Sequence, residues 1–431
     1  MVNLYSTSVF KLSRGIQYYA TWVLFAFLPL HALLVTFLNY RLGAPNIIAW
    51  KEVALLILAC VALWNVVTKK TKIKLDLTTW LILAYLALGV LSPVFHNYEY
   101  GLKQWIYGMR FDYAFLITFL IFRHLVFSEE EKNRLIKTLI ISGTLSVVYG
   151  ILSFLTLLIV DPSILTNLGF RNDWSTFRPG EALAFCQKIE NQNLCRLQST
   201  FSGPNQYGMF LAVFSGVLLY ARGMNTRFRI VATALTLISL PLTFSRTAII
   251  GLATAVVFTF KKTFKYAAIA VCCVAMVAIT ALAIEPLRNI IIRPASTGGH
   301  LANMKLAVER IVEHPFGMGL ASAGPANSYF SEPGRAFHPE NWYLQVGVEL
   351  GWIGMSVFIA IILTMIKELF ATVRREPENL IAKIGLFGLI AISTGALFLH
   401  SFEDSATTIL LFALLGQDFG FGPLLRKSMA L

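Results

Sequence analysis

Residues 230–260 read IVATALTLISLPLTFSRTAIIGLATAVVFTF, a long apolar stretch that Ser245 and Arg246 interrupt. As helix, each arm beside this pair would be roughly 22 Å long, shorter than the ~30 Å hydrocarbon core of a bilayer. An ionisable side chain at that depth is costly and usually lines a pathway or a site. We therefore predict two short membrane crossings that meet at a polar turn, with Arg246 in a water-filled recess or beside a locally thinned bilayer. The alternative is an arginine that marks a helix end and extends to the interface.

Apolar runs of similar character recur along the whole chain, which is 56% hydrophobic and 14% charged. Soluble domains are usually about a quarter charged, so these values predict an all-α integral membrane protein with about 12 transmembrane helices. Lys and Arg clusters follow alternate spans, which is the positive-inside pattern and places both termini in the cytoplasm. The other candidate spans are 17–39, 47–67, 77–95, 104–122, 136–160, 203–221, 266–284, 343–366, 380–399 and 406–422.

The net charge of +13 is explained by these orienting clusters. A nucleic-acid-binding protein would instead carry a basic run with interleaved aromatic residues, and the sequence has none. We therefore expect membrane lipids as partners, and no nucleic acid.

Residues 1–431 are predicted to form a single polytopic membrane domain with two long loops on the side opposite the basic clusters. One loop covers 161–202, and the other covers 285–342 and contains short helices. Long loops of polytopic proteins are where function is best sought. Cys186 and Cys195 lie in the first loop, and because that side faces an oxidising compartment, the pair is predicted to be able to form a disulfide.

Several polar residues near the predicted outer ends of spans are candidates for chemistry. Arg196 precedes a helix start at Pro204-Asn205, and a helix N-terminus beside an arginine suits an anion. His338 stands at the entry to a span and can accept a proton near neutral pH. Lys103 and Arg110 at the top of the 104–122 span are further candidates for substrate binding. Each also has a plainer interpretation, as an interfacial cation or as part of an aromatic belt.

The sequence lacks the patterns of metal and nucleotide sites. It contains no Asp-x-Asp pair and no acidic cluster in the outward loops that would suit Mg²⁺ or Mn²⁺. No glycine-rich phosphate loop is present. We therefore expect no metal and no other cofactor.

Three stretches together resemble the O-antigen ligase and O-antigen polymerase group of bacterial membrane glycosyltransferases. They are Arg196 with Pro204-Asn205, the SRTAIIGL stretch from Ser245, and AVERIVEHPFGMGLASAG from Ala307 followed by His338, Leu350-Gly351 and Gly354. Many members have an asparagine closer to the histidine than Asn341 is to His338. Asn205 and Asn341 are retained as substrate-binding candidates.

The resemblance implies a GT-C-like, metal-independent inverting transferase in the bacterial inner membrane, with its site facing the periplasm. The donor would be a glycan on undecaprenyl diphosphate, and in a ligase the acceptor would be a sugar hydroxyl of lipid A-core. A polymerase or a protein O-oligosaccharyltransferase would use the same donor with another acceptor. Independently of the resemblance, guanidinium groups such as those of Arg196 and Arg246 suit a leaving diphosphate, and His338 suits the role of base. A transporter or flippase is the competing class, because charged residues and helix breaks also mark transport sites.

Overall fold

Local signals in the sequence set several helix boundaries. In the computed structural model, which describes residues 2–160, 162–171, 182–189, 194–259, 294–332 and 335–420, Asp76 caps one helix by accepting a hydrogen bond from the Thr79 amide at 2.9 Å. Ser128 and Glu131 form a reciprocal capping box at another helix start. Such caps satisfy amides that lack a partner inside the helix.

In chain order, the elements before residue 200 are α1 (Val2–Phe27), η1 (Leu28–Leu30), α2 (His31–Leu42), η2 (Pro45–Ala49), α3 (Trp50–Val67), α4 (Leu77–Phe95), α5 (Gly101–Arg123), α6 (Glu129–Ile159), η3 (Pro162–Leu168), β1 (Gln187–Lys188) and β2 (Cys195–Arg196). Those after it are α7 (Pro204–Tyr220), α8 (Thr226–Leu242), α9 (Arg246–Thr259), α12 (Pro294–Glu313), α13 (Gly324–Asn327), α14 (Trp342–Arg375), α15 (Leu380–Gly395), η5 (Ser401–Glu403) and α16 (Ser405–Gly420).

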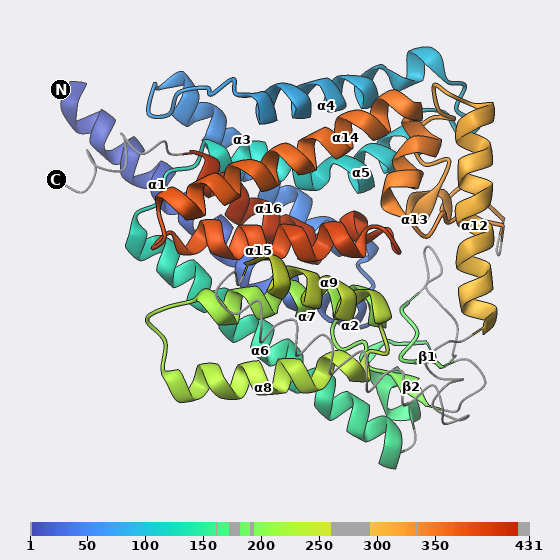
Figure 1. Ribbon diagram of the computed structural model, residues 1–431. Coiled ribbons are helices and arrows are strands. Elements are labelled where there is room, and N and C mark those ends of the chain that lie inside the picture. Colours follow the sequence, from blue (N-terminus) through green and yellow to red (C-terminus); the bar gives the residue numbers. More distant parts are fainter. Residues whose placement is uncertain are drawn as a thin grey trace.

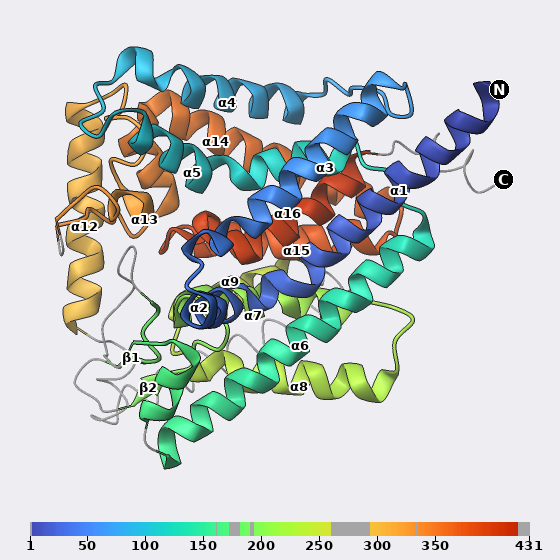
Figure 2. The same ribbon diagram turned by 180° about the vertical axis from the view of Figure 1, so that it is seen from behind.

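The long helices run side by side along one axis, and α12 lies across their ends (Figure 1). The reverse view shows the same arrangement, with the start of α1 and the end of α16 at the end of the bundle opposite α12 (Figure 2). Six helical stretches in the described ranges are long and apolar enough to cross a membrane. The prediction of a multi-pass, mainly helical membrane protein is therefore confirmed.

The expected number of spans stays a prediction, because the candidate span at 266–284 lies outside the described residues. The candidate span at 17–39 is two helices rather than one. Pro29 lies in the short η1 turn between α1 and α2, and proline cannot donate the hydrogen bond that an uninterrupted helix needs. As predicted at the polar turn near Ser245, 230–260 forms two helices, α8 and α9, as far as Thr259.

The loops fall into two sets, one at each end of the bundle. At the end opposite α12, Arg14 pairs with Glu131 at 3.1 Å, and Arg222 pairs with Glu378. At the α12 end, the Trp342 amide donates to the Ala396 carbonyl at 2.8 Å, which joins the start of α14 to the end of α15. The expected positions of these loops relative to the membrane stay a prediction.

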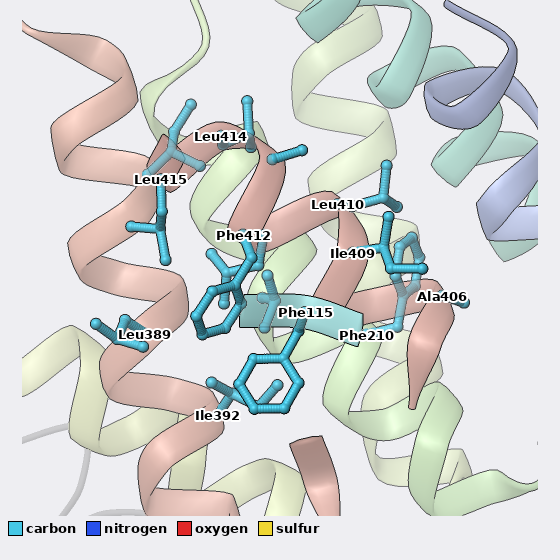
Figure 3. Packing of buried hydrophobic residues seen from close by; sticks show 14 of the residues in the cluster. Phe115, Phe210, Leu389, Ile392, Ala406, Ile409, Leu410, Phe412, Leu414 and Leu415 are labelled. Carbon is cyan, nitrogen blue, oxygen red and sulfur yellow. The ribbon is translucent and has the colours of Figure 1, made fainter. Parts of the chain in front are cut away.

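The centre of the bundle is apolar and closely packed. Figure 3 shows Phe115 of α5 facing Phe412 of α16, and their ring centroids are 4.8 Å apart. Glycine permits the closest helix contact here, since a Cβ at Gly416 would meet the Phe119 carbonyl of α5. Burial of these side chains gives the site at the α12 end a rigid support.

Candidate functional site

A small hairpin near the α12 end positions Arg196. β1 and β2 pair antiparallel, with Gln187 opposite Arg196. In the structure a disulfide joins Cys186 to Cys195, whose Cα atoms are 5.3 Å apart. Both cysteines are buried in a separate apolar cluster that also contains Phe170. The hairpin is therefore fixed by a covalent link and by its own core.

Arg196 is buried and bonds to protein acceptors on three sides. Its Nε donates to the Thr243 carbonyl at 2.9 Å, and Nη2 lies 3.5 Å from the Phe244 carbonyl. The same guanidinium donates to Gln187 Oε1 at 3.2 Å and to Asn205 Oδ1 at 2.6 Å. Thr243 is the C-terminal cap of α8, where a cation stabilises carbonyls that lack helical partners. Arg196 and Asn205 thus hold together the hairpin, the start of α7 and the end of α8.

The turn between α8 and α9 presents Arg246 at the beginning of a helix. Phe244 adopts a left-handed backbone, with φ of +49°, and this reverses the chain direction within three residues. The Ser245 hydroxyl accepts from the Ala248 amide at 3.4 Å. Arg246 is the first residue of α9 and is half-buried. Its guanidinium therefore lies beside helix amides whose dipoles favour an anion.

The α12 helix links Arg246 to the segment that contains His338. Arg246 Nη1 donates to Thr297 Oγ1 at 3.1 Å. One helical turn later, His300 Nδ1 lies 3.4 Å from Glu340 Oε2. Residues three apart on a helix share a face, so α12 brings Arg246 and Glu340 to neighbouring positions. These contacts, together with those of Arg196, place the three predicted catalytic residues at one end of the bundle.

His338 is half-buried, and one of its two ring nitrogens makes no hydrogen bond to the described residues. Its Nε2 lies 3.1 Å from the Ser328 hydroxyl, whereas Nδ1 is buried and has no hydrogen-bond partner among the described residues. Burial lowers the pKa of His338. In the tautomer that donates from Nε2–H to the Ser328 hydroxyl, the lone pair lies on Nδ1, which can then accept a proton.

Two further histidines and one glutamate lie beside His338. The His400 ring centroid is 5.8 Å from that of His338, and burial lowers the pKa of His400 to about 3, with smaller contributions from His338 and His300. Burial also raises the pKa of Glu340 to about 7. Glu340 adopts a left-handed backbone with φ of +56°, a costly conformation that concentrates at functional sites.

The glycine-rich stretch before His338 packs against a break in α14. Gly351 has φ of +69° inside α14, and the helix hydrogen bonds are interrupted there. The Gly319 amide donates to the Glu349 carbonyl at 3.0 Å, and the Trp352 amide donates to the Pro315 carbonyl at 3.1 Å. A Cβ at Gly317 would collide with the Glu349 carbonyl. Gly317 is therefore explained by backbone-to-backbone packing, whereas Gly319 and Gly324 leave room for the side chains of Tyr98 and Gln345.

The remaining predicted residues occupy separate places. Arg110 Nε donates to Glu52 Oε1 at 2.7 Å, and Glu52 also pairs with buried Lys51 at 3.2 Å. Lys103 is exposed in the first turn of α5. Asn341 caps α14 by accepting from the Leu344 amide, and its own amide donates to the Leu397 carbonyl. Both polar atoms of Asn341 are thus engaged in positioning helices.

Sequence reasoning assigned no role to His300, His400 or Glu340. His300 and His400 are far from His338 in the chain, and helix packing brings them close to it. Glu340 could have been proposed from the sequence, because it lies two residues after His338. Among the described residues, no group of three or more His, Cys, Asp or Glu is arranged to hold a metal ion.

The comparison with known families bears on this end of the molecule. Residues 231–359 match the family model described as O-antigen ligase. The predicted resemblance is confirmed. This ligase-like region, residues 231–359, includes Arg246, α12 and His338, whereas Arg196 and Arg110 precede it. No curated protein matches the chain.

Proposed function

We propose that this protein is an O-antigen ligase of the bacterial inner membrane. It transfers a glycan from undecaprenyl diphosphate to a sugar hydroxyl of lipid A-core at the periplasmic face, without a metal and with inversion at the anomeric carbon. One observation carries the proposal: the ligase-like region contains both Arg246 and His338, and α12 joins their surroundings through Thr297 and His300.

Arg246 is proposed to bind the donor diphosphate. Breaking the bond between the sugar and the diphosphate develops negative charge on phosphate oxygens, and preorganised donors stabilise that charge. A planar guanidinium can bind two oxygens at once, whereas lysine offers a single point charge. Arg246 is also the first residue of α9, and the dipoles of a helix N-terminus favour an anion.

The sequence led us to expect that Arg196 binds the diphosphate. We propose instead that its main role is to position Arg246. Its guanidinium already donates to the carbonyls of Thr243 and Phe244 and to Asn205. Those carbonyls belong to the turn that precedes Arg246. Arg196 therefore acts by fixing the orientation of the α9 N-terminus.

His338 is proposed to be the base. The acceptor hydroxyl attacks the anomeric carbon from the face opposite the diphosphate, its proton moves to His338 Nδ1, and the diphosphate leaves with the electrons of the broken bond. Burial lowers the pKa of His338 and keeps the imidazole neutral before the reaction. Because Nδ1 is covered in this arrangement, the segments around it must move to admit the acceptor.

The lipopolysaccharide profile of a deletion strain tests this function. A ligase predicts lipopolysaccharide core that carries no O-units and an accumulation of lipid-linked glycan. Core that carries a single O-unit would instead identify a polymerase. If purified protein with lipid-linked donor and acceptor gives no covalent product, a transporter becomes the better account.

A further inference from the structure

Three carboxyl groups lie together inside the bundle, apart from the residues proposed for transfer. Asp112 of α5 is 0% exposed, Glu349 of α14 is 1% exposed and Glu403 of η5 is 7% exposed. The Asp112 carboxyl neighbours both of the others. We call these three residues the carboxyl triad.

The triad has more acceptors than donors. Both carboxyl oxygens of Asp112 and one oxygen each of Glu349 and Glu403 are buried with no hydrogen-bond partner among the described residues. Gln345, which is also 0% exposed, donates from Nε2 to Glu403. Its Oε1 at the same place is another buried acceptor without a partner. Buried polar atoms are nearly always paired, so these five oxygens indicate something that supplies positive charge or donors.

None of the described side chains around the triad is a cation. In the described part of the chain, no ion pair includes any of the three carboxyls. The ionisable groups that face the triad are tyrosines, contributed by α4, the α4–α5 loop, α5 and the segment after α13: Tyr85, Tyr98, Tyr113 and Tyr329. Three adjacent negative charges without a cation would be prohibitively costly in an apolar interior.

We propose that the carboxyl triad is a proton-binding site, in which protonated carboxyls donate to neighbouring carboxylate oxygens and to Gln345 Oε1. This arrangement satisfies the unpartnered acceptors and removes most of the negative charge. It also agrees with the lack of a metal-binding arrangement of His, Cys, Asp or Glu among the residues described. The site goes beyond the proposed transfer reaction, which uses none of these carboxyls.

The position of the triad links its protonation to the packing of the 315–324 loop on α14. Glu349 lies two residues before the break at Gly351, where its carbonyl accepts from Gly319 of the 315–324 loop. Ionised carboxyls would repel one another and loosen this contact, and the loop leads directly towards His338. Protonation of the triad therefore stabilises the closed packing of the loop on α14.

Burial raises the pKa of Glu403, and the Asp112 carboxyl raises it further. A group whose pKa is higher in the folded than in the unfolded state stabilises the fold at low pH, and that contribution is lost as pH rises through the folded pKa. The thermal unfolding temperature of the detergent-solubilised protein should accordingly fall as pH rises above neutral. Glu403→Gln, which mimics the neutral acid, should weaken this dependence.

Infrared spectroscopy of the full-length protein in lipid tests the proposal directly. At neutral pH the wild type should show a carboxylic-acid carbonyl band that decreases on alkaline titration. The band should be reduced in Glu349→Gln and Glu403→Gln and unchanged in Glu130→Gln, whose carboxyl is exposed. The wild-type titration remains decisive even if a triad variant fails to fold.

Two results would overturn the proposal. One is the absence of a carboxylic-acid band from the wild type at neutral pH. The other is calorimetric binding of Na⁺, Mg²⁺ or Ca²⁺ to the wild type that disappears in Glu403→Gln, since a metal ion would then supply the missing charge.

Discussion

The two sides of the turn between α8 and α9 hold one arginine each, in opposite electrostatic settings. Arg196 lies at the C-terminus of α8, where backbone carbonyls accept from its guanidinium. Arg246 begins α9, where backbone amides point outward and its guanidinium contacts Thr297 of α12. The first arginine complements its helix end, whereas the second adds positive charge to an end that is already positive.

The two settings suit different roles, a structural one for Arg196 and an anion-binding one for Arg246. Arg196 is 7% exposed and belongs to a hairpin that a disulfide closes, so its environment is satisfied without a ligand. Arg246 increases the local positive potential, which is favourable when an anion is bound there. Substitutions of the two arginines should therefore have different effects on turnover and on stability.

Among the variants that compare the two arginines, the largest effect is expected for Arg246→Lys. Loss of the bidentate contact should reduce turnover by ~10²–10³, equivalent to about 2.7–4 kcal/mol of transition-state stabilisation. Turnover of lipid-linked donor by purified protein is the measurement. Arg222→Lys, at the opposite end of the bundle and paired with Glu378, is the matched control. An Arg246→Lys protein with undiminished turnover would remove Arg246 from the site.

Removal of the disulfide should lower the stability of the fold more than it lowers the turnover rate. The cysteines are nine positions apart, and on the chain-entropy model a loop of that size is worth ~2–3 kcal/mol. The Cys186→Ser, Cys195→Ser double variant should therefore unfold at lower temperature, whereas Cys60→Ser, at an exposed free cysteine, should not. If both thiols of the wild type can be alkylated without reductant, the bond is absent from the protein.

Arg196→Lys should show a stability defect together with a smaller loss of turnover than Arg246→Lys. Lysine cannot reach the same set of acceptors, and each buried group left unpaired costs about 1–3 kcal/mol. Thermal unfolding and donor titration of both variants should be compared under the same conditions. Normal stability combined with abolished donor binding would place Arg196 in direct contact with the diphosphate and end the distinction.

The smallest effect concerns pH. Burial lowers the pKa of His338, so its base function should persist below the ordinary histidine value of ~6.5. The acid limb of kcat/KM should accordingly have its midpoint below that value. A midpoint at or above it would mean that another group, such as Glu340, controls the protonation that limits the reaction.

Much of the fold could be predicted, because apolar runs and capping residues are local signals. The 77–95 span coincides with α4, and the Ser245-Arg246 interruption is a helix junction. The break at Gly351 was not predicted, since its cause is the docking of the 315–324 loop, a distant segment. The same reason explains why the bond from Asn341 to the Leu397 carbonyl was not predicted, and why the carboxyl triad was missed: its members come from three separate elements.

The central claim is that Arg246 binds the donor and His338 acts on the acceptor, and it is tested by measuring donor affinity and turnover together. His338→Ala should bind lipid-linked donor with wild-type affinity and lose turnover by ~10²–10⁴, the usual contribution of a general base. His314→Ala, at an exposed position on the same loop, is the control and should retain both properties, whereas Arg246→Ala should lose donor affinity. If His338→Ala abolishes donor binding as well, His338 is a diphosphate ligand, and the division of roles proposed for the two residues is wrong.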